Sequence, residues 1–241
     1  MKDTIKITDK GTTKMIAHRG ASGLERENTL PAFIAAGNRS YFGAECDIHV
    51  TKDGKYVVYH DDETGRLCDK NVVIEETEFS TLRALKLKEP DSETFSETLK
   101  IPTPEEYLSV LRRYGKVAVI ELKNAMKPAN ICEIIEICKQ CYSLDRIVFI
   151  SFCFENLVEV RKILPKQPVQ FLCGDWSDEL EEKLSTHRFD LDIGWWSLNE
   201  ERIRSLHDKG IKINCWTCDD AEKAEQLALW GVDFITTNIL E

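Results

Sequence analysis

The sequence predicts a closed (β/α)8 barrel, and three observations support this fold class. Short apolar runs rich in β-branched residues alternate with amphipathic stretches along most of the chain, a pattern typical of parallel βαβ units. About eight such units are present, which is the number that closes into a barrel. The length of 241 residues is within the range of one such barrel, so we expect a single domain over residues 1–241.

The strand-like runs are apolar and bounded by turn residues. They cover residues 14–18, 43–50, 56–60, 117–122, 146–151, 169–172, 190–193, 211–217 and 233–237. Stretches with a helical period lie between most of them. They cover residues 29–38, 103–114, 128–141, 155–164, 178–187, 199–209 and 219–230.

Local signals mark the ends of several helices. Asn199 before Glu200 gives an N-cap with an acidic first turn, and Lys209 before Gly210 gives a basic last turn and a stop. A helix, a glycine and a strand follow one another again at Gly231, as in the short αβ loops of barrels. An open doubly wound sheet is the competing architecture. The absence of a dinucleotide fingerprint and of a Walker A loop disfavours it.

Residues from about 64 to 101 interrupt the alternation. This segment is charged and irregular, and residues 82–85 give its only helical signal. Long irregular loops inside a compact fold are usually functional. We therefore interpret the segment as an insertion over the barrel mouth.

Composition limits the function and the location. A formal net charge of −10 opposes binding to nucleic acid or to an anionic membrane. The chain has no apolar run long enough for a membrane span, and its first residues lack the apolar core of a secretory signal. Nine cysteines, an odd number, are scattered along the chain, which is typical of free thiols in a reducing compartment. We expect a cytoplasmic protein without stable membrane association.

Three carboxylates point to a metal site. Glu45 and Asp47 are two residues apart on one strand, so their side chains share a face. Glu121 follows four apolar residues of another strand, where an unpaired charge is costly. A lone acid at a strand end is usually an ion-pair or capping residue, but these three would gather at the barrel mouth, where active sites lie. Oxygen ligands favour Mg²⁺ or Ca²⁺, so we expect one such cation here.

Two histidines end strand-like runs. His18 ends the first run and His60 the third, so both are expected at the rim that carries the acids. Two imidazoles beside three carboxylates indicate acid-base chemistry. His49 would share the face of Glu45 and Asp47 if their strand ran that far, and the sequence leaves open whether it reaches the site.

Positive and aromatic residues complete the candidate site. Arg19 directly follows His18, and Lys123 shares the face of Glu121. These two cations would supply the local positive charge that a phosphate needs on an acidic protein. Trp216 alternates inward at the mouth, either as an apolar wall for a substrate or as part of the core.

The motifs that contain these residues resemble those of the glycerophosphodiester phosphodiesterase family. The N-terminal set is His18-Arg19-Gly20-Ala21-Ser22-Gly23, Glu27-Asn28-Thr29 leading into Pro31-Ala32-Phe33, Glu45-x-Asp47, Thr51-Lys52-Asp53-Gly54, His60-Asp61 and Glu121-x-Lys123. Weaker matches are Ser151-Phe152, Asn214-x-Trp216-Thr217 and Gly231-Val232-Asp233. The likeness therefore covers nearly the whole chain.

The resemblance implies a barrel of the phospholipase C-like phosphodiesterase type, with a small insertion after the strand that ends at His60. It implies hydrolysis of glycerophosphodiesters to sn-glycerol 3-phosphate and an alcohol, within glycerol and lipid metabolism. The family's catalytic histidines match His18 and His60; we assign His18 as base and His60 as acid, an order that the sequence itself leaves open. Its metal ligands match Glu45, Asp47 and Glu121. Arg19 and Asn28 match positions that support the phosphate and the site's geometry, and Lys123 matches a site lysine; with Trp216, these are the expected substrate-binding residues.

Three positions depart from the family's usual pattern. Arg26 stands where proline commonly precedes the Glu-Asn-Thr motif, Cys153 stands where aspartate is frequent, and Asn238 stands where aspartate often lies. No catalytic group is lost. The departures leave the alcohol specificity open.

Two other functions are compatible with the sequence. A lysophospholipase D-like hydrolase would need an apolar channel at the mouth, whereas the polar insertion favours small soluble substrates. A non-catalytic protein that binds glycerophosphate esters would usually lack a histidine or a ligand, and none is missing here. The oligomeric state is open.

Overall fold

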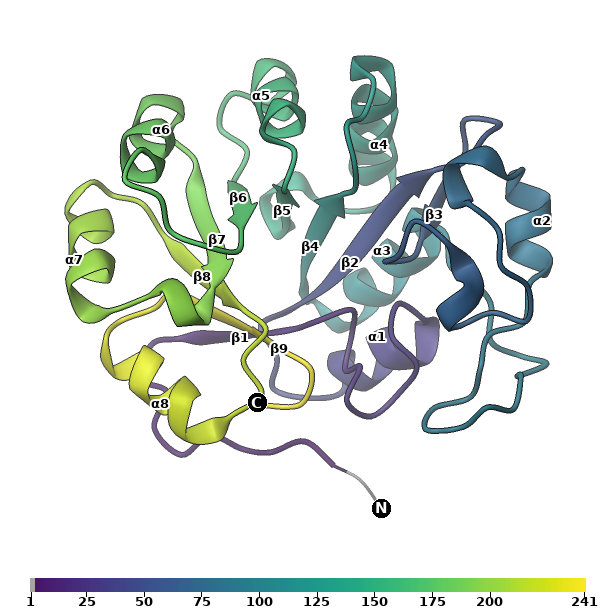
Figure 1. Ribbon diagram of the computed structural model, residues 1–241, viewed down its shortest axis with the longest axis horizontal. Coiled ribbons are helices and arrows are strands. Elements are labelled where there is room, and N and C mark those ends of the chain that lie inside the picture. The colour runs from purple at the N-terminus through teal and green to yellow at the C-terminus, as the bar shows by residue number, and fades with distance from the viewer. Residues whose placement is uncertain (1–2) are drawn as a thin grey trace.

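The computed structural model, which describes residues 3–241, contains a closed barrel of parallel strands with helices around it (Figure 1). The barrel strands are β1 (Lys14–Ala17), β2 (Gly43–Val50), β4 (Val117–Leu122), β5 (Ile147–Ser151), β6 (Val169–Cys173), β7 (Asp190–Gly194), β8 (Ile213–Trp216) and β9 (Phe234–Thr237). They pair in that order, and β1 closes the ring by pairing with both β2 and β9. The predicted (β/α)8 fold is confirmed, and the open sheet is excluded.

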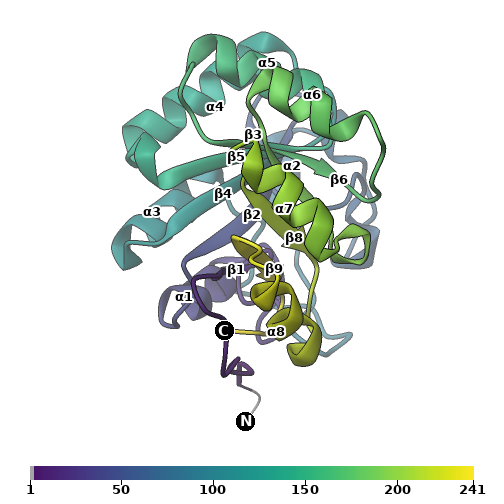
Figure 2. The ribbon, with the colours of Figure 1, turned by 90° about the vertical axis from the view of Figure 1, so that its left-hand side faces the viewer.

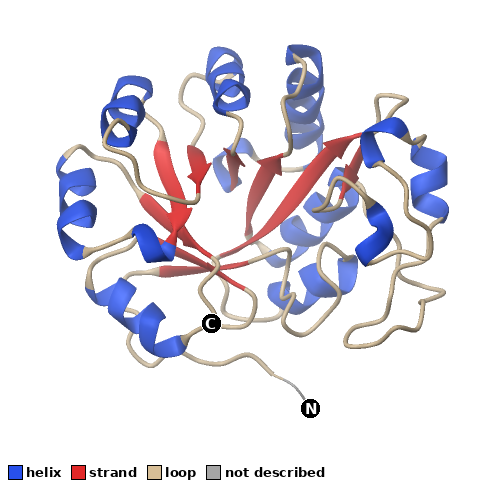
Figure 3. Cartoon of the chain, viewed as in Figure 1, coloured by secondary structure: helices blue, strands red, loops and turns tan. Residues whose placement is uncertain are grey.

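Helices cover the outside of the barrel (Figures 2 and 3). They are α1 (Leu30–Gly37), α3 (Pro104–Tyr114), α4 (Pro128–Cys141), α5 (Phe154–Ile163), α6 (Leu180–His187), α7 (Glu200–Asp208) and α8 (Ala221–Leu229). Within the described part of the chain, every helix is too short or too polar to cross a membrane.

The ends of α3 illustrate how local sequence sets a helix. The Thr103 side chain accepts a hydrogen bond from the Glu106 backbone N–H, and the Glu106 carboxylate accepts one from the Thr103 backbone N–H, which forms a capping box ahead of Pro104. Gly115 ends the helix in the left-handed region, at φ 63°, where a side chain would be strained. Parallel strands require a crossover of this kind, so each such end returns the chain to the barrel.

The apolar core has two layers separated by the strands. Alternate residues of β4 show the division: Ile120 points outward to the helices, while Val117 and Val119 point into the barrel. Ile150 and Leu172 join them in the barrel interior. This inner layer closes the barrel below the polar mouth.

The third predicted strand does not belong to the barrel. β3 (Tyr56–Val58) is antiparallel to β2, with Val58 opposite Ile48 and Tyr56 opposite Val50. β2 has eight residues, so it extends beyond the mouth, and β3 returns along this extension. The sequence signal was correct for a strand, but the parallel direction inferred from the βα rhythm was wrong.

The insertion has an apolar core of its own, which its charged composition concealed. It contains α2 (Phe79–Ala84), as residues 82–85 indicated, and the short helices η1 (Thr64–Arg66) and η2 (Ile74–Glu76). Its buried side chains pack on Val57 and Tyr59, which belong to the segment around β3. The insertion therefore lies against the flank of β2 and β3 beside the mouth (Figure 1).

Replacing Leu82 with alanine should destabilise the fold, because Leu82 is fully buried in the insertion core. We expect a loss of about 2–5 kcal/mol in the free energy of unfolding, measured by urea denaturation. Leu229 is 85% exposed, so Leu229→Ala is the matched control and should change stability by less than about 0.5 kcal/mol. Equal stabilities for the two variants would show that the insertion is not packed as described.

Candidate active site

The carboxylates of Glu45, Asp47 and Glu121 meet at the mouth of the barrel. Asp47 on β2 is in register with Glu121 on β4, and Glu45 lies two residues before Asp47 on the same inner face. One oxygen from each of the three lies within 4.8 Å of the others, and all three residues are buried. Among residues 3–241, no other group of three acidic, histidine or cysteine side chains comes together in this way.

Burial and mutual repulsion act on these acids unequally. Burial, followed by the charges of Asp47 and Glu121, raises the pKa of Glu45 well above its usual value. Burial and then Asp47 raise the pKa of Glu121 to about 8. Burial would also raise the pKa of Asp47, but Lys123 and Arg19 outweigh it and lower that pKa. Lys123 Nζ lies 3.0 Å from Glu121 Oε1 and 3.5 Å from Asp47 Oδ1.

The donor set fits a hard divalent cation. Asp47 Oδ1 is buried without a hydrogen bond, although such an atom normally has a partner. Three carboxylate oxygens at this spacing repel one another, and a cation between them reverses that interaction. Carboxylates without sulfur or imidazole donors favour Mg²⁺ or Ca²⁺ over softer metals.

His18 follows β1 and is held by an amide. Its Nδ1 lies 2.8 Å from Asn238 Oδ1, and Asn238 Nδ2 donates to Asp219 Oδ2 at 2.6 Å. Because that amide nitrogen is occupied, Asn238 Oδ1 is the acceptor and His18 Nδ1 carries the proton. Burial and then the charge of Arg19 lower the pKa of His18 to about 4. Asn238, which stands where the family often has aspartate, thus gives His18 a neutral partner, and the carboxylate of Asp219 lies on the far side of Asn238.

His60 reaches the mouth on the return strand. Tyr59 N donates to Asp47 O, so His60 ends beside the acids although β3 runs against the barrel strands. Its Nδ1 lies 2.7 Å from Asp61 Oδ1. Burial lowers the pKa of His60, against the opposing effect of Asp47.

His49, whose role the sequence left open, contacts the backbone of His60. Its Nε2 lies 3.3 Å from His60 O, and its Nδ1 lies 3.3 Å from Glu75 Oε1. His49 lies on β2, opposite Val57 of β3, and its side chain is fully buried. His49 is therefore outside the group of carboxylates and supports the segment that carries His60.

The loop after β1 folds around the acids. Arg19 and Asn28 both have left-handed backbones, at φ 54° and 53°, and Asn28 Nδ2 donates to Asp47 Oδ2 at 2.8 Å. Gly20 is required between them, because a Cβ there would lie 2.7 Å from the Ala32 backbone. Arg19 Nε lies 3.7 Å from Asp47 Oδ2.

Arg66 joins the insertion to this loop. Its guanidinium donates to both oxygens of Glu27 at 2.8 Å and to Asp61 Oδ2 at 2.6 Å. Arg19 Nη1 also contacts Glu27, at 2.8 Å. Arg26, at the position where the family commonly has proline, donates to the backbone carbonyls of Lys88 and Glu89 in the insertion.

A cavity of about 300 Å³ opens beside the acids. The predicted site residues on its wall are His18, Arg19, Glu45, His60, Glu121 and Trp216. Trp216 forms an apolar wall of this cavity and makes edge contacts with Phe152 and Trp196, which are 50% and 53% exposed. A second cavity, of about 440 Å³, lies on the other side of His18 and Arg19.

Asp192 is the acidic residue of this cavity that the sequence did not indicate. It lies on β7, is 2% exposed, and lines the cavity. Burial and then Glu121 raise its pKa well above the usual value. The sequence did contain one signal. Asp190 and Asp192 are two residues apart in an otherwise apolar strand, so their side chains share a face, and an acid on the buried face of a strand requires a partner.

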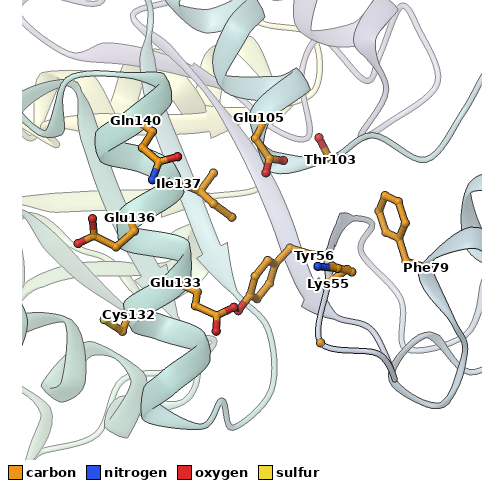
Figure 4. Close-up of a pocket in the computed structure, with 11 residues that line it drawn as sticks. Lys55, Tyr56, Phe79, Thr103, Glu105, Cys132, Glu133, Glu136, Ile137 and Gln140 are labelled. Atoms are coloured by element: carbon orange, nitrogen blue, oxygen red, sulfur yellow. The ribbon is translucent and has the colours of Figure 1, made fainter.

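A third cavity lies away from the mouth, between α4 and the segment around β3 (Figure 4). Glu105, Glu133 and Glu136 are on its wall, and the Tyr56 hydroxyl donates to Glu133 Oε2 at 2.8 Å. It contains none of the predicted site residues. The chemistry expected from the sequence therefore belongs to the barrel mouth.

Comparison with known proteins identifies relatives across nearly the whole chain. Residues 18–241 match the model of the glycerophosphoryl diester phosphodiesterase family. A glycerophosphodiester phosphodiesterase of Caldanaerobacter subterraneus is 29% identical, over 94% of each chain. One from Bacillus subtilis is 28% identical, over 92% of this chain and 82% of that protein.

Solved structures of phosphodiesterases are also similar to this chain. An Oleispira antarctica phosphodiesterase, determined in complex with the product sn-glycerol-3-phosphate, superposes with a TM-score of 0.87 at 26% identity, over 94% of this chain and 93% of that one. A Thermotoga maritima glycerophosphodiester phosphodiesterase has a TM-score of 0.76 at 26% identity, over 95% of each chain.

Divalent cations should stabilise the chain through Glu121. At a concentration 100 times the dissociation constant, Mg²⁺ or Ca²⁺ should add about 2.7 kcal/mol, seen as a higher Tm that chelator reverses. Glu121→Gln should lose most of this response, because one anionic ligand is gone. Glu136→Gln, a change at the third cavity, should keep it. A wild-type Tm that is indifferent to both ions would contradict the assignment of a metal site.

Arg66→Gln should lower stability at neutral pH and matter less in acid. Arg66, with Arg19, holds the pKa of Glu27 at about 2 although burial opposes this, and Arg66 likewise holds Asp61 at about 2. A depressed pKa contributes stability that is complete above the unfolded pKa near 4 and disappears as pH falls toward 2.

Because Arg66 is 45% exposed, we expect a difference of about 1 kcal/mol at pH 6. The difference should shrink at pH 3 in urea titrations. Arg204→Gln, which removes an exposed ion pair with Glu200, is the control and should have a smaller effect at both pH values. A deficit for Arg66→Gln that stays constant between pH 6 and pH 3 would refute this linkage.

Proposed function

Because the chain belongs to the glycerophosphoryl diester phosphodiesterase family, we propose that it hydrolyses glycerophosphodiesters to sn-glycerol 3-phosphate and an alcohol, with a divalent cation and two histidines. The observation that carries this proposal is a cavity whose wall contains His18, His60 and two members, Glu45 and Glu121, of the buried group of three carboxylates. The Oleispira relative, with that phosphate monoester as its product, supports the same substrate class.

The charges at the mouth suit a phosphodiester. Arg19 and Lys123 are the cations nearest the carboxylates, and they offset the negative field of an acidic protein where an anionic phosphate must bind. A Mg²⁺ or Ca²⁺ ion held by Glu45, Asp47 and Glu121 would neutralise charge that develops on the phosphate oxygens. The burial of the three carboxylates strengthens these interactions.

The two histidines are suited to opposite roles. His18 donates from Nδ1 to Asn238, so its Nε2 keeps a lone pair that can take a proton from the attacking hydroxyl, either of water or of the glycerol 2-position. His60 has Asp61 at its Nδ1, and that carboxylate stabilises the protonated ring, which can protonate the leaving alcohol. The phosphorus–oxygen bond to the alcohol breaks, and one water is consumed overall.

The alanine variants of His18 and His60 should each reduce kcat about a hundredfold or more, because each removes a proton-transfer group. We would measure choline release from glycerophosphocholine with Mg²⁺, with Ca²⁺ and with chelator. His207 is exposed and pairs with Asp233, so His207→Ala is the control and should keep full activity.

Several results would count against this proposal. Turnover near the wild-type rate in a folded His18 or His60 variant would remove that histidine from the mechanism. Activity that survives chelation would exclude the cation. Binding of glycerophosphocholine without turnover by the wild type would favour a binding protein instead.

A lysophospholipase D-like activity is the second candidate, and one observation favours it. The half-exposed rings of Phe152 and Trp196 stand beside Trp216 at the rim of the cavity, where they could pack on an acyl chain. Faster turnover of lysophosphatidylcholine than of glycerophosphocholine would identify this activity.

The proposed setting is the cytoplasm, with small soluble diesters as substrates in glycerol and lipid metabolism. Nine free thiols and a net charge of −10 support a reducing compartment and disfavour anionic membranes and nucleic acid. Fractionation of cells that express the intact chain would test the location.

A further inference from the structure

A row of polar side chains crosses the barrel interior on the side away from β2. Gln170, Asp192, Asn214 and Thr236 come from the neighbouring strands β6, β7, β8 and β9, and each is at most 4% exposed. Buried polar groups at such a depth are retained when hydrogen bonds satisfy them. The hydrogen bonds within this row therefore show which polar atom has no protein partner and is available to a ligand.

The row is joined through Asn214. Its Nδ2 donates to Asp192 Oδ2 at 3.1 Å and to Gln170 Oε1 at 3.4 Å, and its Oδ1 accepts from the Thr236 hydroxyl at 3.1 Å. Both ends of the Asn214 amide are thus occupied. Asp192 Oδ1 is buried and has no hydrogen-bond partner.

The unpartnered oxygen belongs to a residue that lines the same cavity as the two histidines. Because Asp192 Oδ2 accepts from Asn214, the proton of a neutral Asp192 carboxyl would lie on Oδ1 and could be donated toward the cavity. Burial, followed by the charge of Glu121, raises the pKa of Asp192 well above its usual value, a direction that favours the neutral form. A neutral acid at this position is a hydrogen-bond donor for an oxygen of a ligand.

The walls around this donor restrict what the ligand can be. Ile150, Leu172 and Trp216 are apolar surfaces of the cavity, whereas Asp192 and Thr236 are polar groups on its wall in addition to the predicted site residues. A short carbon chain that carries hydroxyl groups matches this division, since its C–H groups meet the apolar walls and its oxygens meet the polar ones. The cavity also contains His18, His60, Glu45 and Glu121, so a phosphate at the carboxylates can be linked to such a chain.

We propose that Asp192 is a specificity-determining residue, whose Oδ1 hydrogen-bonds a hydroxyl of the glycerol moiety in the mouth cavity. This inference rests on the proposed function and adds the residue that distinguishes a polyol from a plain alkyl group. A site built to bond a hydroxyl rejects the analogue that lacks it, because the analogue leaves the buried polar group without a partner.

The experiment compares three anions in the wild type and in Asp192 variants. Binding of sn-glycerol 3-phosphate, propyl phosphate and inorganic phosphate is measured by calorimetry with Mg²⁺, and choline release from glycerophosphocholine is followed alongside. The wild type should bind glycerol phosphate at least about tenfold more tightly than propyl phosphate.

The variants separate the donor from the shape of the cavity. Asp192→Leu should bring the ratio of the two affinities close to one, while inorganic phosphate binds as in the wild type. Asp192→Ala removes the same donor with a smaller side chain, so the inference does not depend on the folding of one variant. Asp192→Asn should keep the preference, because its oxygen can accept from Asn214 while its NH₂ group faces the cavity. Ile150→Val, an apolar change in the same cavity, should alter both affinities alike.

The outcomes distinguish this inference from the function on which it rests. Unchanged discrimination in folded Asp192→Leu and Asp192→Ala, with normal wild-type turnover, overturns the role of Asp192 and leaves the proposed function standing. Equal loss of all three anions in these variants also overturns it, since that would be a structural effect. A wild type that releases no choline and prefers no glycerol phosphate overturns the proposed function and this inference together.

Discussion

The pairing of β2 with β4 is the constraint on which the site depends. It sets Asp47 beside Glu121 on a buried inner face of the barrel. Glu45 lies two residues before Asp47 on β2, so its side chain points to the same face. Three acids in that space are stable only with compensating groups. The left-handed turn at Arg19, the amide of Asn28 and the ion pairs of Lys123 supply them. The conformation of the first loop thus follows from the charge that the barrel buries.

Much of this arrangement could be predicted from the sequence. Strand periodicity alone indicates that Glu45 and Asp47 share a face, and the rule that barrel sites lie at strand C-termini brings Glu121 to them. The parallel direction expected for β3 was wrong, although the sequence held a signal against it. Residues 51–55 are too short a link for a parallel crossover, and a short link that contains Asp53-Gly54 predicts a hairpin. The position of Asp192 in the cavity wall was also harder to predict: an acid in a strand is usually an ion-pair residue, and its parity with Asp190 does not tell which face of the strand is the barrel interior.

The insertion shows a different limit of sequence patterns. Leu67, Ile74, Leu82 and Leu87 are buried in one cluster, but they come from separate short segments and not from one continuous helix or strand. Most of their partners come from short turns and 3₁₀ segments, where the side-chain direction depends on the tertiary fold. A charged composition therefore concealed a packed core. What the sequence did reveal was the boundary, because the rhythm of the barrel stops there.

The hairpin of β2 and β3 carries one of the two imidazoles outside the closed ring. His18 stands on the barrel wall, whereas His60 stands on an appendage whose position is set by apolar packing and by Arg66. Substitutions in the appendage can therefore move one imidazole without disturbing the fold of the ring. During divergence, such a division lets selection retune the distance between the paired groups while the scaffold and its buried acids remain the same.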